Sequence, residues 1–152
     1  MKGSKWSWTN ACEEAFREVK RLVTSDLVLM HYNPELSVSL ACDASAYGLG
    51  CVLSHVLPGG QERPIAFASR TLNAAERRYS QKDKGALSIV WRVKKCYMYL
   101  YGRHFRLITD HKPLLSILSA EQGTNATTAA RLQGHALFLA GHDYEIIYKN
   151  TK

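Results

Sequence analysis

Apolar residues recur at helical spacing in three stretches of the chain. The first stretch follows Thr9, a residue type that often caps a helix N-terminus. The longest begins at Ser80, which can form a capping box with Asp83, and Gly102 is expected to end it. The predicted helices are therefore 10–25, 80–102 and 129–139, with shorter helical turns at 73–79 and 114–118.

Alternation of apolar and polar residues, bounded by Gly, Pro and Asn, predicts five strands. Gly48 and Gly50 are expected to bracket the turn between the first two strands, and 58–61 is expected to be a hairpin loop. Three strands joined by short turns favour an antiparallel meander, and two further strands reached through helices favour a mixed sheet. The fold class is therefore α/β, with strands at 36–42, 49–57, 63–72, 103–109 and 144–148.

Composition and charge narrow the class of protein. The 152 residues are enough for one domain with a core, and no apolar run approaches the ~20 residues needed to span a bilayer. No signal peptide is visible, and the four scattered cysteines lack a CxxC spacing, so we expect an intracellular protein with buried free thiols. The formal charge of +7 favours an anionic partner such as nucleic acid, although a basic surface can also serve solubility alone.

Two acids stand at the carboxyl ends of predicted strands. Asp43 follows the first strand and Asp110 follows the fourth. Groups at strand ends in such sheets tend to form the site, and two carboxylates that meet there would make a hard oxygen site for Mg²⁺ or Mn²⁺. Two-ion phosphodiester chemistry usually needs three or four acids. Spacing alone therefore leaves a turn-capping role for both residues equally open.

Longer sequence motifs indicate a family resemblance, which the spacing of the two acids alone does not. The motifs, in chain order, are Cys42-Asp43-Ala44-Ser45, Pro64 to Leu72, Ala86-Leu87-Ser88-Ile89-Val90, Tyr99-Leu100-Tyr101-Gly102 and Thr109-Asp110-His111-Lys112-Pro113. This pattern resembles the ribonuclease H domain of gypsy-class LTR retrotransposon reverse transcriptases. The resemblance extends over nearly the whole chain, because Trp8, Cys12, Ala15 and Phe16 match the connection that precedes that domain.

The resemblance implies a ribonuclease H-like fold and cleavage of the RNA strand of RNA/DNA hybrids by two Mg²⁺ or Mn²⁺ ions. Asp43 and Asp110 match the first and third acids of the family, which are catalytic residues and metal ligands. The second acid is a Glu in the long helix, and Gly85 occupies its position. Asp83 lies ~200° away around the helix and is not expected to replace it. We therefore predict an activity that is weak or absent.

The resemblance also implies partners and a domain organisation. Arg70, His111 and Lys112 are predicted contacts to the hybrid, because its backbone needs basic partners. The predicted partners are an RNA/DNA hybrid and the polymerase portion of a reverse transcriptase polyprotein, with no membrane. Residues 1–34 are expected to form an N-terminal helix and connection, and 35–152 a ribonuclease H-like domain that stops before the family's fourth acid.

Two alternatives to an enzyme remain open at this stage. The chain is either a non-catalytic nucleic-acid-binding or domesticated retroelement fragment, or a structural fragment that is stable only beside the polymerase portion. Gly85 is the residue that separates the enzyme from the binding module.

Overall fold

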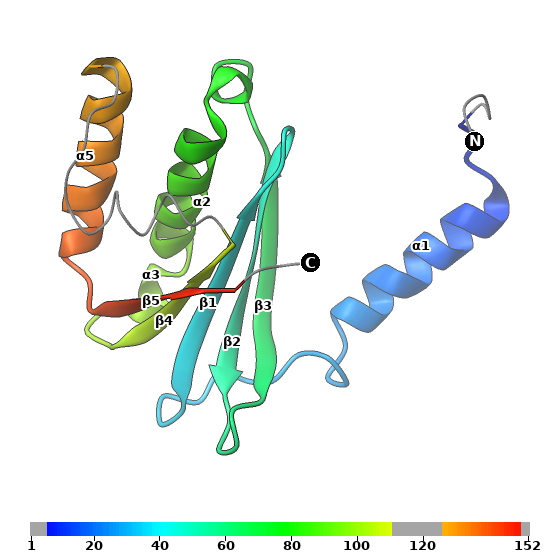
Figure 1. Ribbon diagram of the computed structural model, residues 1–152. Coiled ribbons are helices and arrows are strands. Elements are labelled where there is room, and N and C mark those ends of the chain that lie inside the picture. The colour runs from blue at the N-terminus through cyan, green and yellow to red at the C-terminus, as the bar shows by residue number, and fades with distance from the viewer. Residues whose placement is uncertain (1–5, 111–125, 150–152) are drawn as a thin grey trace.

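A computed structural model describes residues 6–110 and 126–149, which form one five-stranded sheet with helices (Figure 1). The strand order across the sheet is β3-β2-β1-β4-β5. All five strands lie close to their predicted positions, and the mixed five-stranded sheet is confirmed. The strands are β1 (Ser37–Ala44), β2 (Gly48–Val56), β3 (Glu62–Thr71), β4 (Phe105–Thr109) and β5 (Tyr144–Tyr148).

Strand direction changes at β1. β2 pairs antiparallel with both β1 and β3, whereas β4 pairs with β1, and β5 with β4, in parallel. Parallel neighbours need a crossover connection, and helices supply it here. Between β3 and β4 lie the 3₁₀ turn η1 (Glu76–Arg78), α2 (Gln81–Lys95) and α3 (Tyr97–Leu100), and α5 (Ala126–Ala140) lies between β4 and β5. The predicted turn at 114–118 lies outside the described residues.

The turn between β1 and β2 corrects one prediction. Gly48 and Gly50 do not bracket the turn but lie within β2, where Gly50 pairs with Asp43. Ser45 forms the turn, because its Oγ accepts the backbone N–H of Gly48 at 3.0 Å. Gly48 is needed for another reason: a Cβ there would lie 3.0 Å from the carbonyl oxygen of Arg70 on β3. The glycine thus allows close approach of two strands, which the sequence pattern does not distinguish from a turn.

α2 packs on the sheet and forms most of the helical side of the core (Figure 1). Ser80 caps it as predicted, since its Oγ accepts the backbone N–H of Asp83. Ile89 and Val93 are fully buried against strand residues such as Leu40. The predicted helix over 80–102 is interrupted at Cys96, so that α2 and α3 are separate.

α2 also buries a charge. Arg92 is only 1% exposed, and among the described residues none of its three side-chain nitrogens has a hydrogen-bond partner. Its guanidinium lies 5.3 Å from the ring centroid of Trp91. Burial lowers the pKa of this guanidinium, because a desolvated cation is disfavoured.

α1 (Asn10–Val23) has a different environment. Thr9 caps it as predicted, accepting the N–H of Cys12, yet none of its residues is buried. It extends away from the sheet and the other helices (Figure 1). The chain joins the sheet only afterwards, where Met30 donates its N–H to the Pro64 carbonyl at 2.7 Å. None of the helices in the described parts of the chain is long and apolar enough to cross a bilayer.

Candidate active site

The two predicted acids meet at one end of the sheet. β1 and β4 are adjacent and parallel, with Ala41 opposite Ile108, so continuing the register by two residues brings Asp110 beside Asp43. Both acids are exposed and line the same hollow of about 160 Å³. One carboxylate oxygen of Asp43 accepts the backbone N–H of Ala44 at 2.7 Å, which orients its side chain. The predicted convergence of two carboxylates is therefore a feature of the structure.

α2 contributes the third side of this hollow. Gln81 donates through Nε2 to the carbonyl of Ala44 at 2.8 Å, and Ser88 donates through Oγ to the carbonyl of Asp43 at 3.1 Å. Both bonds attach one face of the helix to the end of β1. Gly85 lies on this face, one turn after Gln81 and about one turn before Ser88, and it lines the hollow. The helix position that faces the two acids therefore carries no side chain.

Asp83 does not compensate for that absence. It is 4% exposed and is not among the described residues that line the hollow. This placement agrees with the ~200° rotation that separates it from Gly85 on a helix. Its backbone serves the N-terminal cap of α2 instead.

The remaining chemistry of the hollow is polar and uncharged. Cys42 also lines it, and burial raises the pKa of its thiol to about 12, so this side chain is a neutral thiol at ordinary pH. Within 6–110 and 126–149, no group of three or more His, Cys, Asp or Glu residues is arranged to hold a metal ion. The oxygens of Asp43 and Asp110 are hard donors that suit one hydrated Mg²⁺ or Mn²⁺ ion.

Two further hollows also have Asp43 in their lining. One, of about 410 Å³, contains Asp110 and Lys149 together with apolar residues of β1, β2 and β4. The other, of about 640 Å³, runs between the first turn and β3 and contains Tyr47 and Arg70. Asp43 thus lines three hollows, called the depression below, and each of the two larger ones contains one basic residue, Lys149 or Arg70.

Comparison with known proteins identifies the family. The sequence model of the family described as "RNase H-like domain found in reverse transcriptase" matches residues 8–107. The chain belongs to this family. The Pol polyprotein of transposon gypsy from Drosophila melanogaster is 33% identical over 141 residues, which are 91% of this chain and 13% of the polyprotein. That of transposon 297, from the same organism, is 36% identical over 139 residues, 91% of this chain and 12% of the polyprotein. The chain spans only a small part of these relatives.

Solved structures support the fold. The foamy viral protease–reverse transcriptase in complex with an RNA/DNA hybrid matches 100% of this RNase H-like domain and 20% of its own chain, with a TM-score of 0.65 and 17% identity. LC11-RNase H1, isolated from compost, was solved with an RNA/DNA hybrid. It matches 74% of this chain and 85% of its own, with a TM-score of 0.58 and 9% identity. The predicted ribonuclease H-like fold is confirmed.

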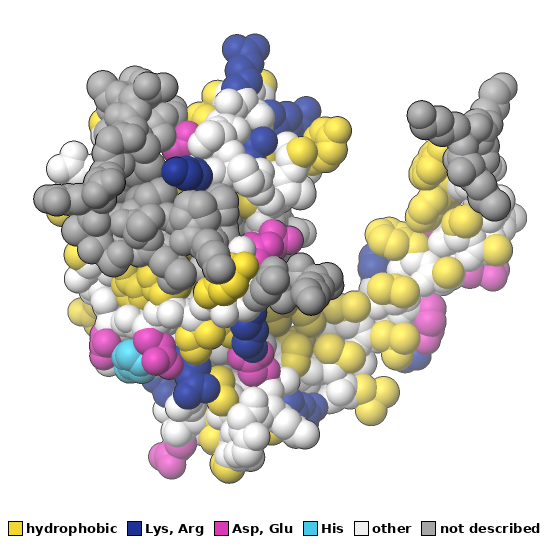
Figure 2. Space-filling model, in the orientation of Figure 1, with side chains coloured by type: hydrophobic (Ala, Val, Ile, Leu, Met, Phe, Trp, Pro, Cys, Tyr) yellow, Lys and Arg dark blue, Asp and Glu magenta, His cyan; other side chains and the backbone are white. Residues whose placement is uncertain are grey.

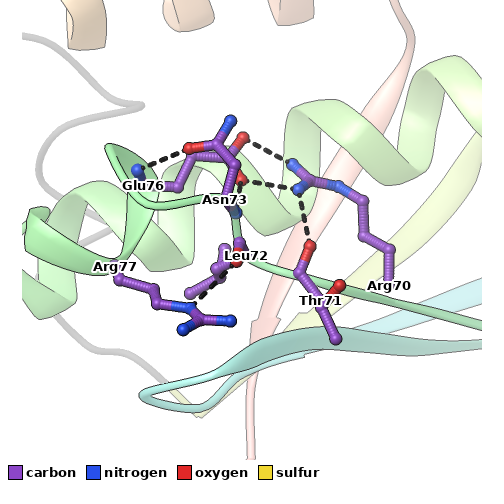
Figure 3. A network of polar contacts seen from close by, with 6 residues as sticks. All are labelled: Arg70, Thr71, Leu72, Asn73, Glu76 and Arg77. Atoms are coloured by element: carbon purple, nitrogen blue, oxygen red, sulfur yellow. Dashed lines mark hydrogen bonds and ion pairs between the residues drawn. The ribbon is translucent and has the colours of Figure 1, made fainter.

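Arg70 has a structural task in this RNase H-like domain (Figure 3). Its guanidinium makes a two-bond ion pair with Glu76, at 2.7 and 2.9 Å. Glu76 also accepts the N–H of Asn73 and donates its own N–H to the Asn73 side chain. The hydrogen bond from Arg70 lowers the pKa of the Glu76 carboxyl, so the pair is ionised at neutral pH. Contact of Arg70 with nucleic acid stays a prediction, and its charge is already compensated by Glu76.

The other predicted basic contacts, His111 and Lys112, lie outside the described residues. Sequence reasoning missed three residues of the depression: Gln81, Ser88 and Lys149. The first two had a signal, since positions 81, 85 and 88 fall on one face of a helix. Lys149 had none, because its place depends on the pairing of β5 with β4.

Proposed function

We propose that this RNase H-like domain binds an RNA/DNA hybrid over the depression around Asp43 and Asp110, and that its cleavage of the RNA strand is weak or absent. One observation carries the proposal: both acids line a single hollow, and the α2 position that faces them is Gly85. The depression is open and polar at its centre, and its two basic residues, Arg70 and Lys149, are each paired with an acid, Glu76 and Glu62.

Relatives and charge support the choice of ligand. Two structural neighbours of this fold were solved with an RNA/DNA hybrid. The chain carries 20 Lys and Arg residues against 13 Asp and Glu residues. A basic protein gains affinity for nucleic acid through the release of counterions from phosphates.

The missing carboxylate explains the expected loss of rate. Asp43 and Asp110 would hold a divalent ion, which when bound supplies charge neutralisation at a phosphate and activation of water. A two-ion site needs more negative charge than these two side chains provide. A carboxylate at position 85 would add that charge from α2, whose face is already held against β1 by Gln81 and Ser88. Preorganised charges of this kind usually give the largest share of a rate enhancement.

Gly85 also favours the second candidate function, a non-catalytic nucleic-acid-binding module. Glycine within a helix costs about 1 kcal/mol relative to alanine, so its presence in α2 does not serve the helix. Retention of the fold, the basic charge and the depression without the second acid is what a domesticated fragment would show. The two candidates differ in cleavage and share hybrid binding.

The test compares the unmodified chain with Gly85→Glu on a labelled RNA/DNA hybrid in Mg²⁺ or Mn²⁺. We expect Gly85→Glu to raise the cleavage rate about 100-fold or more, since one preorganised charged group is worth that much in other enzymes. Gly85→Gln is the matched control, because it raises the helix propensity at this position as glutamate does but adds no charge. Asp43→Asn in the Gly85→Glu background is expected to remove the gain.

Binding is measured on the same variants by fluorescence anisotropy over a range of salt concentrations. We expect salt-dependent binding of the hybrid by the unmodified chain and by Gly85→Gln. Rapid cleavage by the unmodified chain would contradict the role given to Gly85. Absence of salt-dependent binding in every variant would contradict the function altogether.

A further inference from the structure

A row of aromatic side chains lies where α3 meets the end of α5. Tyr97 begins α3 and Tyr101 follows it, and their ring centroids are 5.0 Å apart. Tyr97 also lies 6.5 Å from the ring of His142, which in turn lies 5.0 Å from the ring of Phe138 on α5. These four residues, called the aromatic surface below, come from segments that are distant in the sequence and adjoin in the fold (Figure 1).

Much of the aromatic surface is open to solvent. Tyr101 is 69% exposed and Tyr97 is 43% exposed. Met98, which follows Tyr97, is 86% exposed, and Leu137, which precedes Phe138 in α5, is 70% exposed. A different residue, Leu100, attaches α3 to the core. Large side chains that gather at the surface without serving the core mark an interaction site.

The surroundings of the aromatic surface are basic. The sequence has no Asp or Glu from residue 84 to 109 or from 126 to 142. Lys94 lies over the Phe138 ring, with its Nζ 5.0 Å from the centroid, and Lys95 follows it at the end of α2. Both lysines are exposed, and neither takes part in an ion pair with a described residue. Their charge is therefore available to an anionic partner.

Aromatic rings beside lysines fit a single strand of nucleic acid. Unpaired bases stack on such rings, and lysines neutralise the phosphates that join the bases. A duplex keeps its bases stacked on one another and has no base faces to offer. An anionic lipid surface calls for a long amphipathic helix, whereas α3 has four residues.

α1 shows by contrast why charge matters to this choice. It also exposes hydrophobic side chains (Figure 2), but three acids offset its three bases. Charge therefore does not favour an anion at α1. At the aromatic surface, the nearest acid in the sequence is Asp143, which is paired with His104 at 2.8 Å.

The aromatic surface is separate from the candidate active site. Gly85 lies in the first half of α2 and Lys95 at its end, about 15 Å apart along the helix axis. Among the described residues that line the three hollows around Asp43, none belongs to the aromatic surface. A strand bound there would occupy a second region of the molecule.

We infer that the aromatic surface binds single-stranded nucleic acid. Unpaired bases stack on Tyr97 and Tyr101, and Lys94 and Lys95 contact the phosphates. The inference rests on the ring contacts and the local charge and not on the proposed hybrid binding, so each can fail without the other.

The test measures binding of a short labelled oligothymidylate by fluorescence anisotropy over a range of salt concentrations. We expect Tyr101→Ala to weaken binding at least about fivefold, since stacking of a base on one ring contributes that much or more. Tyr101→Phe is the matched control and keeps the affinity, because it keeps the ring. Lys94→Gln is expected to lower the slope of log affinity against log salt concentration by about 0.7. An oligouridylate is expected to rank the variants in the same order, because DNA and RNA share bases and phosphates.

A blunt-ended RNA/DNA hybrid separates this inference from the proposed function. Tyr101→Ala is expected to bind that hybrid as the unmodified chain does. Loss of oligothymidylate binding alone in Tyr101→Ala supports a separate strand site. An unmodified chain that binds oligothymidylate but not the hybrid would contradict the proposed function and leave this inference standing.

Three results would overturn the inference. The first is an unmodified chain that shows no salt-dependent binding of oligothymidylate, or that binds it no better than Tyr101→Ala does. The second is full affinity in Tyr101→Leu, because an apolar side chain without a ring then suffices. The third is a dimer of the chain, by sedimentation, that Tyr101→Ala converts to a monomer, because the aromatic surface then belongs to a second copy.

Discussion

α1 and α2 are amphipathic helices of 14 and 15 residues, each capped by a hydroxyl side chain, yet their environments are opposite. α2 buries nine of its residues, among them Ile89 and Val93, whereas α1 buries none. The difference lies in what surrounds each helix. α2 belongs to the connection from β3 to β4 and packs on the sheet, whereas α1 precedes the first strand. An apolar face therefore indicates that a helix packs against something, but it does not indicate which part of a protein covers it.

The largest expected effect is on the free energy of unfolding, and it distinguishes the buried apolar face of α2 from the exposed apolar face of α1. Ile89→Ala on α2 is expected to lower the free energy of unfolding by about 2–5 kcal/mol, because it leaves a cavity under a fully buried side chain. Val19→Ala on α1 is expected to leave the midpoint of urea unfolding unchanged. Circular dichroism and tryptophan fluorescence against urea concentration measure both. An equal loss in Val19→Ala would show that α1 is packed within this chain.

A smaller effect on stability distinguishes the partly buried ion pair of Arg70 and Glu76 from an exposed ion pair on α1. Glu76→Gln, next to α2, is expected to cost about 1–3 kcal/mol at neutral pH, because it weakens a partly buried pair with Arg70. Arg70 lowers the pKa of Glu76, so this stability is present above the unfolded pKa and is lost as the pH falls through the lower folded value. The difference between unmodified chain and variant should therefore shrink below about pH 4.

Glu18→Gln on α1 is the matched control for that measurement. Arg21 lowers the pKa of Glu18 in the same way, but both side chains are more than half exposed and solvent screens the pair. We expect no change in urea unfolding at any pH. A pH-dependent loss in Glu18→Gln as large as that in Glu76→Gln would contradict the distinction between the helices.

The smallest effect concerns the caps. Ser80→Ala removes an acceptor for the N–H of Asp83 and is expected to cost about 1 kcal/mol of global stability. Thr9→Ala removes the same kind of bond from α1, and there the expected change is lower helix content without a shift in the unfolding midpoint. Far-ultraviolet circular dichroism before and during urea unfolding distinguishes the two outcomes. A midpoint shift in Thr9→Ala alone would reverse the comparison.

Predictions succeeded where local chemistry decides the structure. β5 has the predicted bounds, and Thr9 and Ser80 cap the helices as expected, because alternation and capping act within a few residues. Predictions failed where distant parts of the chain decide. Gly48 serves the approach of β3 rather than a turn, and Arg92 is buried although no pattern marks it.

The candidate site divides in the same way. The sequence by itself determined the family resemblance, the two acids Asp43 and Asp110, and the glycine at position 85. Only the tertiary structure decided that all three line one hollow, because that depends on the parallel pairing of β1 with β4 and on the bonds from Gln81 and Ser88 to β1. The tertiary structure also left α1 uncovered. Residue identity is a property of each position, whereas proximity and burial arise only when separate elements pack together.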